Sequence, residues 1–73
     1  MAMVRIEVEV TGKVWKIEKQ PGERVEAGEA VLILESMKME IPVEAPQAGV
    51  VRDLKVAEGD VVSEGQVVVS VET

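Results

Sequence analysis

The amino-acid sequence predicts an all-β protein, and three observations support this fold class. Apolar and polar residues alternate along several short segments, which is the period-two pattern of half-buried strands. Valine dominates the apolar residues while phenylalanine and tyrosine are absent, so the core must consist of branched aliphatic side chains, which favour strands. No stretch of about ten residues or more has the apolar spacing of an amphipathic helix.

The strands and turns can be placed in order along the chain. The segment from Met3 to Val10 alternates regularly, and after Gly12 the alternation resumes from Lys13 to Ile17. Turn residues follow at Gln20-Pro21-Gly22 and again at Gly28. We therefore expect two strands in the first part of the chain and a pair of turns before the next one.

A tight hairpin is predicted at residues 35–40, which read Glu35-Ser36-Met37-Lys38-Met39-Glu40. An apolar run at 31–34 leads into this segment and an alternating run at 41–45 leaves it, so two strands meet here. Two-residue hairpin turns favour Asn-Gly or Asp-Gly because both central residues need positive φ. Met37 and Lys38 do not suit such a turn, and conflicts of this kind tend to mark functional sites.

The chain contains an internal repeat with an offset of 37 residues. Each half carries Gly-x-Val, then Gly-acid-x-Val-x-x-Gly, then a valine-rich segment; Gly12 falls on Gly49, Gly22 on Gly59 and Gly28 on Gly65. Two such units predict a pseudo-twofold domain in which neither half can bury its apolar face alone. Lys38 lies at the junction, and its counterpart would be Met1, so we expect the hairpin at one end and both termini at the other.

Composition limits the possible functions. We expect residues 1–73 to form one small domain, since a chain of this length buries only about 60% of its unfolded surface. Cysteine and histidine are both absent, which excludes disulfides, Ser-His-Asp and Cys-His catalysis, and histidine metal sites. Calcium-loop spacing of the carboxylates is also absent. We expect no metal, no catalytic residues and a non-enzymatic protein.

Nucleic acid and membrane partners are not expected. The net charge of −6 opposes binding to phosphates, and Trp15 is the only aromatic residue that could stack on a base. No apolar stretch approaches the roughly 18 residues of a membrane span, and no signal-peptide pattern is present. We therefore expect a cytoplasmic location.

Lys38 is the one residue whose setting indicates chemistry. A lysine on a hairpin tip is ordinarily a solvated surface residue, and the residues alone leave that interpretation open. Met37 and Met39 oppose it, because exposed thioethers gain nothing from burial, while methionine is over-used at surfaces that contact several partners. A Met-Lys-Met tip suits an amine that other proteins grip and modify.

Taken together, the hairpin motif, the Pro46-x-x-Gly49-x-Val51 segment and the two glycine-rich units resemble the biotinyl/lipoyl carrier domain family, from about Val10 to Glu72. Within it the chain is most similar to stand-alone biotin/lipoyl attachment proteins and biotin carboxyl carrier domains. Lipoyl domains typically carry Asp-Lys-Ala or a similar triplet at this position, so Met37 and Met39 favour biotin. Ser36 stands where alanine is commoner, and the extra "thumb" segment of some acetyl-CoA carboxylase carriers is missing.

The resemblance implies a flattened β-barrel, or barrel-sandwich, of two four-stranded sheets. It implies covalent biotin on Lys38, attached by a biotin protein ligase, with Met37 and Met39 serving recognition and Glu35 as a further recognition candidate. The biotin would carry CO2 as carboxybiotin from a biotin carboxylase to a carboxyltransferase, and the cofactor would supply the chemistry. We expect the domain itself to be monomeric.

Two alternatives remain. Lipoate could occupy the same lysine, as in acyl-transfer systems. An unmodified barrel-sandwich module could instead act as an adaptor, in which case Lys38 would have no special role. Fold similarity alone cannot separate these functions.

Overall fold

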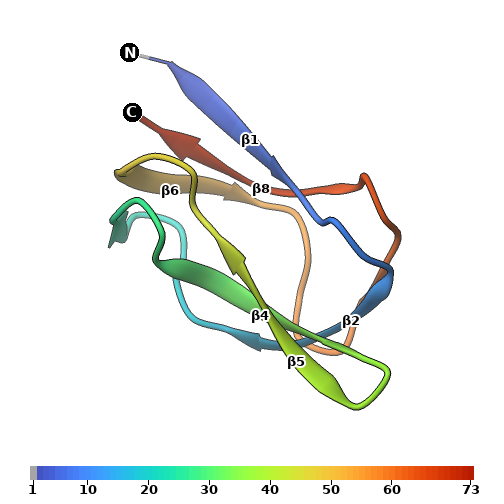
Figure 1. Cartoon of the computed structure of the whole chain (residues 1–73). Coiled ribbons are helices and arrows are strands. Elements are labelled where there is room, and N and C mark those ends of the chain that lie inside the picture. Colours follow the sequence, from blue (N-terminus) through green and yellow to red (C-terminus); the bar gives the residue numbers. More distant parts are fainter. Residues whose placement is uncertain (1) are drawn as a thin grey trace.

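The computed structural model describes residues 2–73 as two four-stranded antiparallel sheets that pack face to face (Figure 1). The first sheet has the order β1 (Met3–Glu7), β8 (Val67–Glu72), β6 (Gly49–Leu54) and β3 (Arg24–Val25). The second has the order β5 (Met39–Glu44), β4 (Ala30–Ser36), β2 (Gly12–Ile17) and β7 (Val61–Val62). The predicted all-β fold class is therefore confirmed. Residues 2–73 contain no helix that is long and apolar enough to cross a membrane.

Strand pairing follows the internal repeat residue by residue. Val14 of β2 pairs with Leu34 of β4, and the same offset of 37 converts this into the pairing of Val51 in β6 with Val71 in β8. Gly12 pairs with Val62 and Gly49 with Val25, so each half extends a short strand into the other half's sheet. The predicted pseudo-twofold arrangement is thus present in the hydrogen-bond register.

The turns of the two halves also have the same backbone geometry. Gly22 and Gly59 both have φ of +96°, and each donates its N–H to the carbonyl of a valine in the other half, at 2.7 Å and 2.8 Å respectively. Gly28 and Gly65 have φ of +84° and +86°. Glycine is favoured here because a Cβ strains the left-handed backbone.

The core between the sheets consists almost entirely of branched aliphatic side chains, as the composition predicts. Alternation is interrupted at one place in β2, where the register shifts between Val14 and Lys16. Simple alternation over residues 13–17 would place Val14 and Ile17 on opposite faces. The bulge lets Val14 and Ile17 both pack into or against the core, while Trp15 remains 48% exposed on the surface.

The molecule is elongated, with extents of 36 × 18 × 18 Å. The β4–β5 hairpin lies at one end and both termini lie at the other (Figure 1). The N–H of Thr73 donates a hydrogen bond to the carbonyl of Ala2 at 2.9 Å, which holds the ends of the chain together. The expected placement of hairpin and termini is confirmed, although Met1, the counterpart of Lys38, lies outside the described residues.

Candidate functional site

The candidate site is the tip of the β4–β5 hairpin. Antiparallel pairing continues to the last possible position, where Ser36 faces Met39, and leaves only Met37 and Lys38 as the connecting residues. The apolar residues of β4 secure this strand in the core, since Leu32 and Leu34 are fully buried. The tight hairpin expected from the sequence is therefore present.

Met37 and Lys38 adopt the backbone conformation for which they are poorly suited. Their φ angles are +51° and +64°, and they are the only non-glycine residues with positive φ among residues 2–73. A two-residue turn with both central residues in the left-handed region matches the twist of the flanking strands and normally carries Asn-Gly. The expected conflict between sequence and turn geometry is confirmed at this hairpin.

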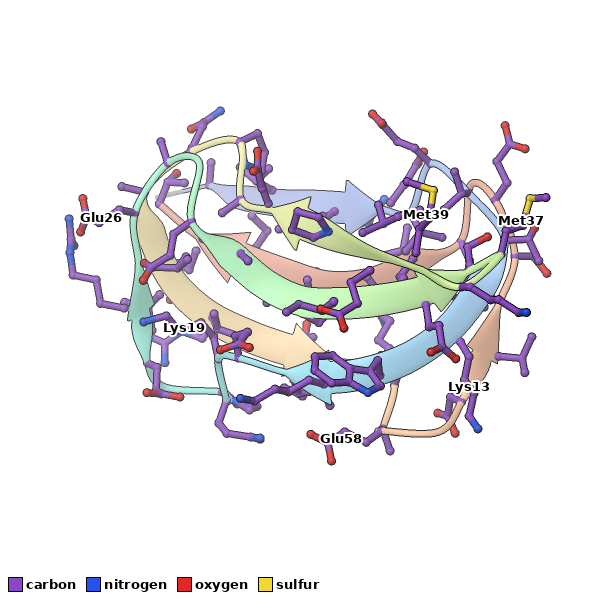
Figure 2. The ribbon with its side chains drawn as sticks, turned by 60° about the horizontal axis from the view of Figure 1, so that its bottom comes forward. Lys13, Lys19, Glu26, Met37, Met39 and Glu58 are labelled. Atoms are coloured by element: carbon purple, nitrogen blue, oxygen red, sulfur yellow. The ribbon has the colours of Figure 1, made fainter. Side chains whose placement is uncertain are left out.

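The side chains of the tip are directed to solvent. Met37 is 92% exposed and Met39 is 64% exposed, and both lie at the same end of the molecule (Figure 2). Lys38, between them, is also exposed. The arrangement offers a primary amine on a flexible four-carbon stem, flanked by two adaptable apolar groups.

The base of the hairpin is fixed by Thr11, a residue that the sequence analysis did not single out. The Ser36 hydroxyl donates to the Thr11 carbonyl at 3.0 Å, and the Thr11 hydroxyl oxygen accepts from the Glu64 N–H at 3.1 Å. Two loops therefore brace the strand end next to the tip. One feature of the sequence could have pointed to Thr11. The repeat aligns it with Ala48, so the hydrogen-bonding side chain is present in the first half only.

Glu35 lies on the other face of the hairpin from Met39. It faces Lys13 across the β2–β4 pair and Glu40 across the β4–β5 pair, and its side chain is exposed. Its repeat counterpart Glu72 accepts a hydrogen bond from the Arg52 guanidinium at 2.7 Å, whereas Glu35 forms no ion pair with any described residue. The hairpin end of the molecule therefore presents an exposed carboxylate without an ion-pair partner among the described residues.

The chemistry available at this site is that of an exposed amine. The described part of the chain, residues 2–73, contains no group of three or more Asp and Glu side chains placed to hold a metal ion. A single protruding lysine without a neighbouring acid–base pair suits covalent attachment of a carried group better than catalysis.

Comparison with known proteins agrees with this geometry. The profile of the biotin/lipoyl family, described as "Biotin-requiring enzyme", matches residues 2–71. The chain is 45% identical over 62 residues to the biotin/lipoyl attachment protein of Bacillus subtilis, covering 85% of each chain.

Two further relatives are parts of much larger proteins. A crystal structure of the urea carboxylase of Kluyveromyces lactis superposes with a TM-score of 0.93 at 35% identity, over 99% of this chain but only 6% of that one. The chain is also 38% identical over 61 residues to the dihydrolipoyllysine-residue acetyltransferase component of the pyruvate dehydrogenase complex of Pseudomonas aeruginosa, of which it spans 11%. The resemblance in sequence extends to the fold, and the chain belongs to the biotin/lipoyl family.

Proposed function

We propose that this protein is a biotin carrier and that the Nζ atom of Lys38 is the attachment point. The observation that carries the proposal is the two-residue turn itself. A lysine and a methionine occupy left-handed positions that glycine or asparagine would fill at lower cost, and both project into solvent. A scaffold gains nothing from this choice, whereas a carrier needs the side chain at that place.

Attachment would form an amide bond between Lys38 Nζ and the carboxyl carbon of biotin. A biotin protein ligase would first activate the carboxyl group as an acyl-adenylate, using ATP and releasing pyrophosphate, and AMP would leave as the amine attacks. The amine proton would pass to the ligase, because no described side chain pairs with Lys38 as a base. Once bound, biotin supplies the CO2-carrying chemistry, while the domain supplies position and reach.

The partners of such a carrier are the ligase, a biotin carboxylase and a carboxyltransferase. Met37 and Met39 are the groups that these enzymes would contact first, since both are exposed beside the amine. Glu35 is a second contact on the opposite face of the hairpin. We propose that residues 1–73 act as a single, monomeric, non-catalytic domain in the cytoplasm.

Lipoate on Lys38 is the second candidate, and the similarity to the acetyltransferase component of Pseudomonas aeruginosa is the observation in its favour. The attachment chemistry would be the same amide bond. Met37 and Met39 favour biotin, because lipoyl domains typically carry other residues at these positions. An unmodified adaptor module is a third candidate, and it requires nothing of Lys38.

Intact mass after co-expression with a biotin ligase tests the proposal. We expect one biotinyl adduct on the parent protein, none on Lys38→Arg, and an unchanged adduct on Lys13→Arg, which removes another exposed lysine near the hairpin strands. A lipoyl adduct would change the cofactor and keep the site. An unmodified protein, with the ligase active on another acceptor, would contradict the proposal and favour the adaptor.

A further inference from the structure

A groove lies between the two sheets, along the edge where β1 and β5 approach each other. Its volume is about 350 Å³, and the carrier function proposed above does not use it. The floor is apolar and formed by Ile6, Leu34 and Val43, which are at most 8% exposed. Ile41 and Val10, both half-buried, complete the apolar lining toward the hairpin.

An apolar track connects this groove to the attachment site. Successive side chains of a strand point to opposite faces, and pairing places Met39 beside Ser36 and Ile41 beside buried Leu34, on the inner face of β5. Exposure falls along this track from Met39 at 64% to Val43 at 8%. The strand that begins directly after Lys38 therefore leads along its inner face into the groove.

The length of a biotinyl-lysine arm matches this track. Ile41 lies three residues beyond Lys38, which corresponds to roughly 10 Å along a strand. About eleven bonds separate the lysine Cα from the bicyclic ring of biotin, which is roughly 14 Å when extended. The ring can thus reach the near end of the groove while its methylene chain follows Met39.

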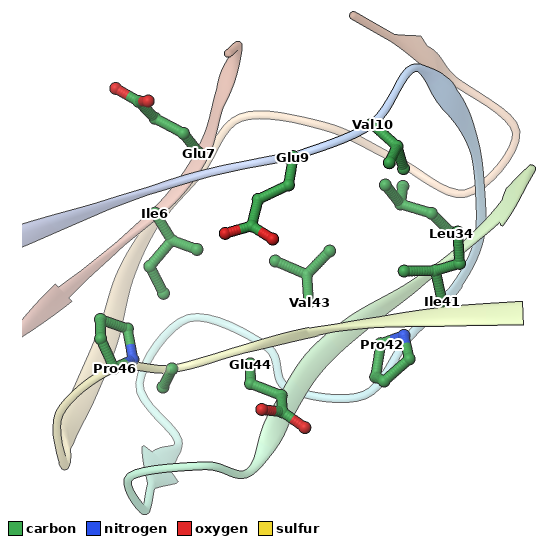
Figure 3. A pocket seen from close by; sticks show the side chains of 11 residues that line it. Ile6, Glu7, Glu9, Val10, Leu34, Ile41, Pro42, Val43, Glu44 and Pro46 are labelled. Atoms are coloured by element: carbon green, nitrogen blue, oxygen red, sulfur yellow. The ribbon is translucent and has the colours of Figure 1, made fainter. Parts of the chain in front are cut away.

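The polar group that faces the groove is Glu9. Its side chain points from the segment after β1 toward Ile6 and Val43 (Figure 3), and it takes part in no hydrogen bond or ion pair with a described side chain. Glu7 and Glu44 are repeat counterparts that also line the groove, and they add negative charge. The position that corresponds to Glu9 in the second half is Pro46, so this acceptor exists on one side only.

We infer that the groove is a resting site for the biotinyl group carried on Lys38, an inference that rests on the proposed function. The uncharged bicyclic ring would cover the apolar floor, and its ureido N–H groups would donate to the Glu9 carboxylate, which is acceptor-only when ionised. A carboxylate on the ureido nitrogen would replace one N–H donor and add a negative charge. The three glutamates would repel that carboxylated form. The groove therefore holds the biotinyl group before it is carboxylated and releases carboxybiotin.

Methyl NMR on the mass-verified biotinylated protein tests this inference. Relative to the unmodified protein, we expect shifts of the methyl signals of Ile41, Val43, Ile6 and Val10, in addition to those of Met37 and Met39. Glu9→Ala should restore the groove signals toward their unmodified positions. Glu40→Ala is the matched control, because Glu40 is closer to Lys38 in sequence but pairs with Glu35 on the outer face, and it should leave the groove shifts unchanged.

Capture by streptavidin gives a second readout. A ring held in the groove for half of the time or more should be captured at least about twofold slower than the ring on the Glu9→Ala variant. Full biotinylation with methyl shifts confined to Met37 and Met39, and equal capture rates, would overturn the groove assignment alone. Absence of any adduct on Lys38 would overturn the carrier function and this inference together.

Discussion

Positive φ angles occur in two kinds of place in this molecule, and the residues that adopt them differ. Four turns use Gly22, Gly28, Gly59 and Gly65, and at each of them no atom beyond the adjoining residues lies within 4 Å of the position that a Cβ would take. These glycines therefore serve backbone conformation and not close packing. At the β4–β5 hairpin the same backbone region is occupied by Met37 and Lys38.

The difference separates the scaffold turns from the proposed attachment site. Where only the backbone matters, the chain has glycine in both halves of the repeat. At the proposed attachment site the chain has two residues with side chains, at a cost of roughly 1–2 kcal/mol per left-handed residue. The hairpin is the one place among the described residues where local preference is overridden in this way.

The largest change in stability is expected at Gly49. This glycine does not have positive φ; it allows its backbone to pack closely against β8. A Cβ there would lie 2.3 Å from the Glu72 carbonyl oxygen and 2.7 Å from a methyl carbon of Val71. We expect Gly49→Ala to lower the free energy of unfolding by about 3 kcal/mol, measured by chemical denaturation.

Gly12 provides the control, because it is the repeat counterpart of Gly49 with more space. The nearest contact of a Cβ at Gly12 would be the Glu35 carbonyl oxygen at 2.9 Å. Gly12→Ala should therefore lower the free energy of unfolding clearly less than Gly49→Ala. Equal losses in the two variants would show that backbone contact distance does not govern these positions.

Much of this architecture could be predicted from the sequence, because the repeat encodes it twice. The offset that aligns Gly22 with Gly59 also aligns strand registers and turn hydrogen bonds, so the pseudo-twofold and the position of the hairpin could be derived from residue types alone. The motif around Lys38 identified the candidate attachment residue, and Met37 and Met39 lie beside it as expected.

Other features depend on three-dimensional contacts that leave no periodic signal. The bulge at Trp15 could not be predicted, because alternation shows which residues are apolar but not where an extra residue is inserted. Thr11 was missed because its hydrogen bonds join residues 25 and 53 positions away. The groove was missed because it forms between β1 and β5, whose edges belong to different sheets.

A smaller decrease in the free energy of unfolding is expected when a turn glycine is replaced by alanine. Gly59→Ala meets no atom, so its cost is conformational and should be about 1–2 kcal/mol in chemical denaturation. Gly22→Ala should lose the same amount, since the two residues share φ of +96°. A neutral effect at both sites would mean that positive φ carries no penalty here, and the strain assigned to Met37 and Lys38 would lose its basis.

The converse change is expected to stabilise the protein and remove its function. Replacing Met37 with Asn and Lys38 with Gly gives the preferred sequence for this turn. We expect the free energy of unfolding to rise by about 1 kcal/mol, because the conformational entropy that glycine loses on folding offsets part of the relieved strain. No adduct should form on this variant when the ligase is present. Met37→Asn alone keeps Lys38 and should give part of the stabilisation. A lower free energy of unfolding for both variants would contradict the assignment of strain to this turn.

The smallest effect concerns acid stability and a position where the two halves differ in charge. Glu29 and its counterpart Gln66 make the same turn contact, in which a side-chain oxygen accepts a backbone N–H, from Glu26 at 2.9 Å and from Ser63 at 3.0 Å. The backbone hydrogen bond from Glu26, together with the Lys19 ammonium at 3.2 Å, lowers the pKa of the Glu29 carboxyl below its usual 4.5. Gln66 cannot titrate.

A lowered pKa in the folded state means that the unfolded chain binds the proton more readily. The contribution of Glu29 to stability is therefore fully present above pH 4.5 and is lost as the pH falls through the lower, folded pKa. Glu29→Gln should keep the turn contact, as Gln66 does, and should reduce the fall in melting temperature on acidification below that pH. Gln66→Glu should make the melting temperature fall further on acidification, but by less than Glu29 does. The reason is that Val56, at the position equivalent to Lys19, offers no positive charge. Identical melting curves for Glu29→Gln and the parent across this range would show that the two turns tolerate acid equally and that the charge difference between the halves has no effect on stability.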